Sequence, residues 1–446
     1  MTPQDLLQLS PRLTRAVWCD NAGLSRGKAV TARLLEGFVQ NGIGMTKGQQ
    51  ALPMMMDAVS EDTGLSAVGE VRLIPDCESA LLLPYAPGTV MAMADMRTLE
   101  GLPWSHCPRS FLKRQLEALG KLGYTVRSSF ENEFYLFRPD GAGGWTPLDG
   151  SNYATLDAFD TAHSFTDKLI DTLEEMGLEP ESYYPESGPG QQEIAIAPAE
   201  GLAAADRQIH FKAAVKALAV RHGLRASFCA KPVLEGAGSG CHLHLSLWQG
   251  GHNVYFDPSD PLKLSRVAYA SIAGILEHAR ALCALTVPSV NSYRRLQPGT
   301  WAGAYACYGV DNREASVRIL SSHWLAGSSG ASAHFELKTV DGSSNPYLAL
   351  GAVLAAMIDG LERGLTPGEP LSLSPGTLSE GERERLDIVQ LPRTLGEAVQ
   401  ALEQDRVLRA ALGEDLFRSF TAVRRLEATY FAEHPELELE KHRFAY

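Results

Sequence analysis

The stretch SFENEFYLF (residues 129–137) predicts a β-strand in which acidic groups occupy alternate positions. Glu131 and Glu133 lie two residues apart, and the period of two in a strand places both carboxylates on the same face. Two acids on one face of an otherwise apolar strand indicate either a solvated surface or a polar site inside the protein. Segments elsewhere in the chain favour the second interpretation.

Two later segments, CHLHLSLW (residues 241–248) and AHFELKT (residues 333–339), show the same alternation. Their polar faces carry His242, His244 and Ser246 in the first segment and His334, Glu336 and Lys338 in the second. For any one strand a solvated face is the usual explanation, but such a face carries lysine, threonine or serine more often than glutamate and histidine. The segment PESGPGQQEIAIAP (residues 185–198) adds Glu186 and Glu193 around a Gly-Pro-Gly turn. We therefore predict that all four segments contribute to one polar site.

Five glutamates and a histidine in one site would repel one another unless a cation neutralised them. An oxygen-rich donor set without thiolates suits Mg²⁺ or Mn²⁺ better than zinc. Because such ions usually meet substrate phosphates, the site predicts phosphoryl transfer and a need for arginines. The segment RRLQPGTWAG (residues 294–303) supplies Arg294 and Arg295, and VDNREASVRIL (residues 310–320) supplies Arg313 and Arg318. Any one of these arginines, taken alone, is more often a surface or salt-bridge residue.

The chain has no GxxxxGKS phosphate loop, and GAGSG (residues 236–240) does not fit the GxGxxG dinucleotide pattern. A bound nucleotide would therefore depend on metal and arginine contacts. The net charge of −13 is spread along the chain, which argues against a nucleic acid or an anionic membrane as partner. Neither a secretory signal nor an apolar run of about 18 residues is present, so we expect a cytoplasmic protein. Seven scattered cysteines without a CxxC pair indicate buried thiols instead of disulfides or a metal site.

With 446 residues and 45% apolar residues, the chain is long enough for a large core and more than one domain. Short apolar runs and many breakers predict a small α+β unit first, with a hairpin around residues 21–27. The segment CPRSFLKRQLEALGKLGY (residues 107–124) has helical periodicity with Pro108 in its first turn, so we place the domain boundary near residue 104. Beyond it, strands alternate with helices, and residues 366–385 are predicted to form an irregular surface loop.

These segments, in this order, resemble the motifs of the glutamine synthetase superfamily. SFENEFYLF is similar to the family's ExE strand and ESGPGQQE to its GxGQxE segment. KPVLEGAGSGCHLHLSL, NSYRRLQPG…DNREASVRI and HFELKTVDGSSNPYLAL resemble the three motif blocks that follow. The resemblance implies an α+β protein with a small N-terminal β-grasp domain (residues 1–104) and a large glutamine-synthetase-type α/β catalytic domain (residues 105–446). It also implies homo-oligomeric rings, as in a dodecamer, with active sites shared between subunits.

The resemblance also implies roles for individual residues. One metal would be held by Glu131, Glu186 and Glu193, and the other by Glu133, His242 and Glu336. The nucleotide would lie near His244 and Ser246 with its phosphates at Arg313 and Arg318, while Gly238, His242, Arg295, Trp301 and Lys338 would bind the other substrates. The family reaction transfers the γ-phosphate of ATP to the side-chain carboxylate of L-glutamate, and an amine then attacks the acyl phosphate. Metals and arginines would stabilise the transferring phosphoryl group, so Arg295, Arg313 and Arg318 are the candidate catalytic residues.

Several positions depart from the pattern of the family members that use ammonia. Those enzymes carry a glutamate at the second position after the RLxPG motif, where this chain has Trp301, and a DGSS-like element where this chain has GIGMTKGQQ (residues 42–50). An ammonium site needs carboxylates to gather and deprotonate a small cation, whereas tryptophan offers a flat apolar or cation-binding wall. Lys338 and His334 stand where the family has arginines, and Ala237 where it has asparagine.

The sequence therefore predicts an ATP-dependent ligase that joins glutamate to a polyamine or a monoamine, with Mg²⁺ or Mn²⁺ as the metal. Such an enzyme resembles the γ-glutamylpolyamine and γ-glutamyl-monoamine synthetases. The alternatives are an ammonia-using glutamine synthetase, a ligase for another carboxylic acid and a non-catalytic structural relative. The complete set of metal ligands argues against the last of these.

Overall fold

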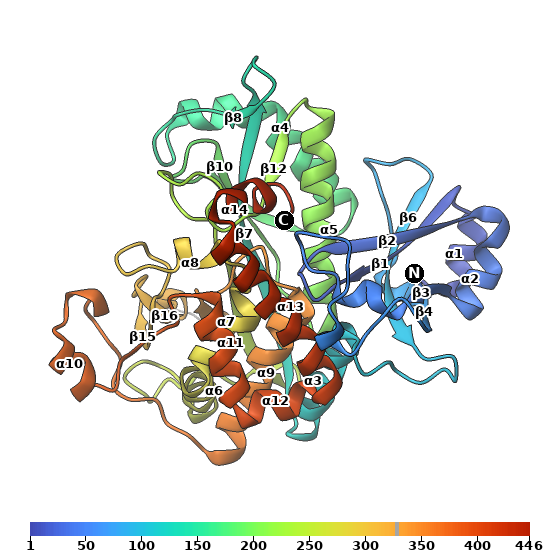
Figure 1. Cartoon of the computed structure of the whole chain (residues 1–446). Helices are drawn as coiled ribbons and strands as arrows, with labels where there is room; N and C mark the ends of the chain where they lie inside the picture. Colours follow the sequence, from blue (N-terminus) through green and yellow to red (C-terminus); the bar gives the residue numbers. More distant parts are fainter. Residues whose placement is uncertain (326–329) are drawn as a thin grey trace.

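The computed structural model describes residues 1–325 and 330–446. It contains a small mixed sheet at the N-terminal end of the chain and a larger sheet that is covered by most of the helices (Figure 1). In Figure 1 the N-terminal sheet, in blue, lies beside the long helix α5 of the larger part. Strands and helices follow each other along the whole chain, which confirms the α+β class.

The N-terminal sheet has six strands in the spatial order β2-β1-β6-β4-β3, with β5 paired to β6. These strands are β1 (Leu13–Cys19), β2 (Ser25–Thr31), β3 (Ile43–Thr46), β4 (Glu70–Pro75), β5 (Leu81–Leu82) and β6 (Thr89–Arg97), accompanied by helices α1 (Pro3–Leu9) and α2 (Leu35–Asn41). β1 and β2 pair antiparallel from Cys19 opposite Ser25, which confirms the predicted hairpin. β1 and β6 are parallel, so the sheet is mixed.

The larger sheet has twelve strands, with the main order β18-β15-β16-β17-β13-β7-β10-β9. These strands are β7 (Thr125–Pro139), β8 (Trp145–Pro147), β9 (Pro180–Pro185), β10 (Gln191–Ile196), β11 (Ala199–Glu200), β12 (Arg225–Ser227), β13 (Cys241–Gln249), β14 (His252–Asn253), β15 (Tyr305–Val310), β16 (Ala315–Ile319), β17 (Phe335–Leu337) and β18 (Val389–Gln390). The three segments with alternating polar residues form β7, β13 and β17, which are neighbours in this sheet. The prediction that they are strands is confirmed.

The larger part also contains the helices α3 (Pro108–Lys121), α4 (Leu156–Glu175), α5 (Leu202–Arg221), α6 (Arg266–Glu277), α7 (Ala279–Thr286), α8 (Ser292–Arg295), α9 (Pro346–Arg363), α10 (Glu380–Arg385), α11 (Leu395–Gln404), α12 (Arg406–Leu412), α13 (Glu414–Glu433) and α14 (Pro435–His442). Among them, α3, α4, α5 and α6 contact strands of the larger sheet. α9 lies among these helices and packs against α3, α5, α6, α7 and α12. Its apolar residues are buried almost throughout, as are Leu243, Leu245 and Leu247 on the inner face of β13.

Two local predictions can be compared directly with the structure. The helix predicted for residues 107–124 is α3, and Pro108 is its first residue. Proline is favoured there because the N–H groups of the first turn have no partner within the helix. The prediction of an irregular loop over residues 366–385 was partly wrong, because this stretch ends in α10. Ser379 caps α10 and Glu382 reaches back to the backbone of Ser379, which forms a capping box.

All seven cysteines are free and buried, as predicted. Within residues 1–325 and 330–446, no helix has both the length and the apolarity needed to cross a membrane.

Candidate active site

The register of the larger sheet brings the polar residues of four strands to one face. Glu131 of β7 lies opposite His242 of β13, and Glu133 of β7 lies opposite Glu193 of β10. On the other side of β13, His244 lies opposite Glu336 of β17. Because directly paired residues on adjacent strands point to the same side of a sheet, these six side chains share one face.

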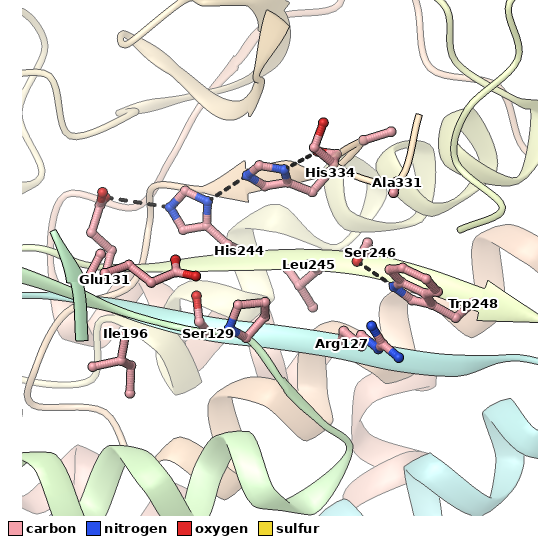
Figure 2. A pocket seen from close by; sticks show the side chains of 15 residues that line it. Arg127, Ser129, Glu131, Ile196, His244, Leu245, Ser246, Trp248, Ala331 and His334 are labelled. Carbon is pink, nitrogen blue, oxygen red and sulfur yellow. Dashed lines mark hydrogen bonds and ion pairs between the residues drawn. The ribbon is translucent and has the colours of Figure 1, made fainter. Parts of the chain in front are cut away.

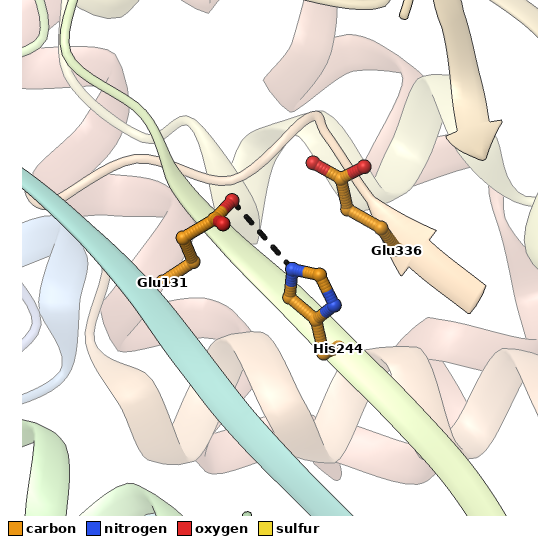
Figure 3. Close-up of side chains that lie close together, drawn as sticks. All are labelled: Glu131, His244 and Glu336. Atoms are coloured by element: carbon orange, nitrogen blue, oxygen red, sulfur yellow. Dashed lines mark ion pairs between the residues drawn. The ribbon is translucent and has the colours of Figure 1, made fainter. Parts of the chain in front are cut away.

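The first half of this face is a cluster of glutamate and histidine around Glu131. His242 Nδ1 lies 2.9 Å from Glu131 Oε2 and 3.0 Å from Glu336 Oε1. One ligand atom each from Glu131, His244 and Glu336 lie within 4.8 Å of one another. Figure 3 shows these three side chains close together. The Nε2 atom of His244 is buried without a hydrogen-bond partner and lies 3.6 Å from Glu131 Oε2. Two carboxylates and an imidazole in this geometry can hold a divalent cation.

Positive neighbours keep the carboxylates of this first half ionised. Burial opposes ionisation of Glu336, but the nearby Lys338 and His242 hold its pKa well below the usual range. The Nζ atom of Lys338 lies 3.2 Å from Glu336 Oε1, and the guanidinium of Arg318 lies 2.9 Å from its other oxygen. Burial likewise opposes ionisation of Glu131, yet the neighbouring imidazoles of His242 and His244 hold its pKa well below normal.

The second half of the face contains Glu133, Glu186 and Glu193, and here negative charge is in excess. Burial and the charges of Glu131 and Glu133 raise the pKa of Glu193 to about 10. Burial and the charge of Glu133 also raise the pKa of Glu186. Burial and like charges together thus disfavour the ionised form of these carboxyls, which a bound cation would favour.

The grouping of the acids in the structure differs from the one that the sequence resemblance implied. Glu131 lies with His242 and Glu336, because β7 and β13 pair at Glu131 and His242. Glu133 lies with Glu193 across the β7–β10 pair, and its charge perturbs Glu186. In these contacts Glu131 and Glu133 exchange the neighbours expected for them, although His242 Nε2 also lies 3.7 Å from Glu133 Oε1.

A cavity of about 470 Å³ opens on the His244 side of this face (Figure 2). His244 and Ser246, the expected nucleotide neighbours, both line it. His334 also lines it, with its Nε2 atom 3.1 Å from Nδ1 of His244, so the histidine that replaces a family arginine is hydrogen-bonded to the cluster.

Sequence reasoning missed two further residues of this first cavity, Arg127 and Trp248. The indole of Trp248 donates a hydrogen bond to Ser246 Oγ at 2.9 Å, and the Arg127 guanidinium lies 4.0 Å from the centroid of the indole ring (Figure 2). Both residues continue the period of two, since Trp248 follows Ser246 on β13 and Arg127 precedes Glu131 by four residues on β7. The same alternation that identified the glutamates could have found them.

A second cavity of about 380 Å³ lies on the other side of Glu131, which lines both. Its walls include Gly238, Arg295, Trp301, Arg313 and Lys338, all of which were predicted site residues. Arg295 is buried, and its guanidinium donates to the carbonyl oxygens of Lys338 (3.1 Å) and Val340 (3.3 Å). A Cβ atom on Gly238 would come within 2.6 Å of the Arg295 side chain, so only glycine fits there.

The arginines of the site therefore have different environments. Arg313 is exposed and lines only the second cavity, whereas Arg318 is directed at Glu336. Arg294, next to the buried Arg295, pairs with Glu438 and lines neither cavity.

Comparisons with known proteins agree with this geometry. Residues 5–104 match the glutamine synthetase N-terminal domain, and residues 105–442 match the glutamine synthetase catalytic domain. A glutamine synthetase from Halobacterium salinarum is 38% identical over 381 residues, which cover 84% of this chain and 83% of the relative. A γ-glutamylpolyamine synthetase from Streptomyces coelicolor is 34% identical over 414 residues, which cover 92% of this chain and 88% of the relative.

Solved structures show the same similarity over the whole chain. A novel glutamine synthase homologue has a TM-score of 0.85 at 33% identity and covers 97% of this chain and 98% of its own. A complex of GmaS with ADP has a TM-score of 0.84 at 32% identity, and the match covers 97% of this chain and 96% of the GmaS chain. The chain therefore belongs to the glutamine synthetase family, whose members are ATP-dependent ligases that use divalent metals.

Proposed function

We propose that this ligase joins the γ-carboxylate of L-glutamate to an amine larger than ammonia. The observation that carries the proposal is the place of Trp301 on the wall of the second cavity, beside Arg295 and Arg313. Ammonia-using relatives need a carboxylate at the corresponding position, because a small cation must be gathered and deprotonated there. An indole instead provides an apolar surface for an organic amine.

The two halves of the polar face would hold two divalent metal ions. Glu131, His242 and Glu336 are the ligands we propose for one ion, because His242 Nδ1 lies between the two carboxylates, and His244 lies beside this group. Glu133, Glu186 and Glu193 are the ligands we propose for the other ion. The donors fit Mg²⁺ or Mn²⁺ because they are mostly carboxylate oxygens, and the raised pKa of Glu193 marks negative charge that a cation would neutralise. When bound, the ions would offset the charge of the transferring phosphoryl group.

ATP would bind in the first cavity and glutamate in the second, with Glu131 between them. A γ-carboxylate oxygen of glutamate attacks the terminal phosphorus, and the bond to ADP breaks. The amine nitrogen then attacks the carbonyl carbon of the γ-glutamyl phosphate, loses a proton and displaces inorganic phosphate. Arg295 would bind the carboxylate of glutamate, and Arg313 and Arg318 would stabilise the phosphoryl group.

Ammonia is the second candidate substrate, because several relatives at 33–38% identity are named glutamine synthetase. Phosphate release from ATP and Mg²⁺ with glutamate separates the two candidates when ammonium is compared with putrescine, spermidine, ethanolamine, alkylamines and aniline. We expect the highest kcat/KM with an organic amine. Strongest activity with ammonium would exclude the main proposal, and no activity with any amine would favour a non-catalytic relative.

The variant Trp301→Ala tests the role of the indole. We expect it to change the ranking of the amines by about tenfold or more, while the KM for ATP changes less than twofold. Trp145→Ala is the matched control, because Trp145 lies on β8 and lines neither cavity. An unchanged amine ranking in Trp301→Ala would mean that Trp301 only packs within its loop and does not select the amine.

A further inference from the structure

Trp301 has a backbone conformation that is unusual for its residue type. Its φ angle is +59°, in the left-handed region that costs a bulky side chain free energy. Its side chain is 62% exposed, so burial of the indole does not offset this cost. Strained backbone that persists at the wall of a cavity needs other interactions to fix it, and such strain clusters at functional sites.

Glu314 supplies these interactions from the far side of the loop. Its Oε1 atom accepts a hydrogen bond from the backbone N–H of Trp301 at 2.9 Å, and its Oε2 atom accepts one from the N–H of Gly299 at 3.1 Å. Between them, the hydroxyl of Thr300 donates to the carbonyl oxygen of Arg295 at 3.0 Å. The loop is thus fastened both to Glu314 and to the segment that carries Arg295. Hydrogen bonds to a charged carboxylate are stronger than neutral ones.

The charges around the second cavity restrict which amine could lie against this loop. The guanidinium of Arg313 lies 5.8 Å from the centroid of the Trp301 ring. Among the described residues, the carboxylates that line the cavity are Glu131, Glu133, Glu186 and Glu193. All four are ligands in the metal sites proposed above, and the nearby carboxylate of Glu314 is engaged by the N–H groups of Trp301 and Gly299. The described residues of the cavity wall thus offer no further acid to pair with a second ammonium group. Tyr153 and Tyr184 add aromatic surface to the same cavity.

We infer that Glu314 is a positioning residue that fixes Trp301 as the wall of the amine subsite, and that this subsite takes amines with one positive charge and an apolar body. A dication would bring its second charge towards Arg313 without a carboxylate partner, which is unfavourable. An alkyl or aryl group would cover the indole and the tyrosine rings. The inference rests on the proposed function for its substrate class, whereas the role of Glu314 in holding the loop does not.

The test compares Glu314→Ala and Glu314→Gln with wild type, and uses the exposed Glu380→Ala as a matched control. In Glu314→Ala we expect kcat/KM for the preferred amine to fall about tenfold or more, with the KM for ATP within twofold. Glu314→Gln keeps one acceptor oxygen, so its loss should be smaller. A diamine should be used at least tenfold less well than the monoamine of the same chain length.

A second readout follows the loop without any turnover. Acrylamide quenching is measured for each protein and for its Trp301→Phe counterpart, and the difference reports Trp301 alone. We expect the rate of Trp301 quenching to change in Glu314→Ala and to stay at the wild-type value in Glu380→Ala. Thermal unfolding of each variant identifies any that fail to fold, and Glu314→Gln then carries the comparison.

The two parts can be overturned separately. Unchanged Trp301 quenching and unchanged amine kinetics in Glu314→Ala would refute the positioning role. A diamine used better than its monoamine would refute the single-charge subsite. Wild-type activity with ammonium alone would refute the proposed function and the amine class, while the quenching result would still decide the role of Glu314.

Discussion

The pKa of Glu193 leads to a prediction about metal binding. Burial and the charges of Glu131 and Glu133 raise this pKa from an ordinary value of 4.5 to about 10, so the metal-free protein keeps the Glu193 carboxyl protonated at pH 7. A carboxylate must be ionised to bind a metal. If Glu193 is a ligand, the binding of Mg²⁺ or Mn²⁺ must therefore release its proton.

The expected pH dependence of metal affinity follows from the release of one proton for each metal ion bound. Between pH 6.5 and pH 8.5, which lies below a pKa of about 10, the affinity for the metal should rise about tenfold per pH unit. The raised pKa of Glu193 makes the stability of the metal-free protein fall with rising pH, whereas the metal affinity rises. Because the folded-state pKa is raised, this loss of stability runs from about pH 4.5 to about pH 10. Bound metal should remove this loss.

The assay is a calorimetric titration of the metal-free protein with Mn²⁺ in two buffers of different ionisation enthalpy. The dependence of the observed heat on the buffer gives the number of protons released, and we expect at least one in the wild-type protein. Glu193→Gln should release one proton fewer, and Glu200→Gln, which removes an exposed carboxylate, should match the wild type. An affinity that does not depend on pH, or equal proton numbers in wild type and Glu193→Gln, would refute the reasoning.

Three other substitutions test individual contacts. Arg295→Lys should raise the KM for glutamate about tenfold or more in initial-rate assays, because lysine loses the two-pronged guanidinium, while Arg294→Ala should leave that KM nearly unchanged. Arg109→Met should cost about 3–5 kcal/mol in urea unfolding, since Arg109 is buried and binds three aspartates, and Lys113 would be the cation that remains beside Asp95 and Asp76. His278→Gln should cost about 2–4 kcal/mol at pH 6, because His278 bonds Asp405 and Asp359. Burial opposes protonation of His278, but the two aspartates raise its pKa. The stabilisation by protonated His278 is therefore full below about pH 6.5 and is lost as the pH rises through the raised pKa. A difference in unfolding free energy between wild type and His278→Gln that did not shrink by pH 9 would contradict this.

The sequence predicted the strands of the site because their alternation depends only on local geometry. β7, β13 and β17 each keep polar residues at every second position, and a period of two determines the face without knowledge of neighbouring strands. The same rule also reaches Arg127 and Trp248, which went unnoticed because neither residue type suggested a metal ligand. The capping box of α10 was likewise present in the sequence, as Ser379 and Glu382.

The division of the acids between the two proposed metal sites could not be predicted in this way. Glu131 and Glu133 share a face, so spacing alone does not distinguish them. What separates them is register: β13 places His242 beside Glu131, and β10 places Glu193 beside Glu133. Register depends on pairing between segments that lie far apart in the chain, and a motif match does not contain it.

The unequal charge of the two halves explains why selectivity for the amine should come from the Gly299–Trp301 loop. The half around Glu336 is already balanced by Lys338 and Arg318. The half around Glu193 has excess negative charge and lines the second cavity, where an amine would otherwise be attracted by any of its acids. Once a metal ion neutralises those acids, they no longer favour one amine over another. The remaining differences between amines are size, apolar surface and additional charge. Trp301 would discriminate by size and apolar surface, and Arg313 would discriminate by additional positive charge.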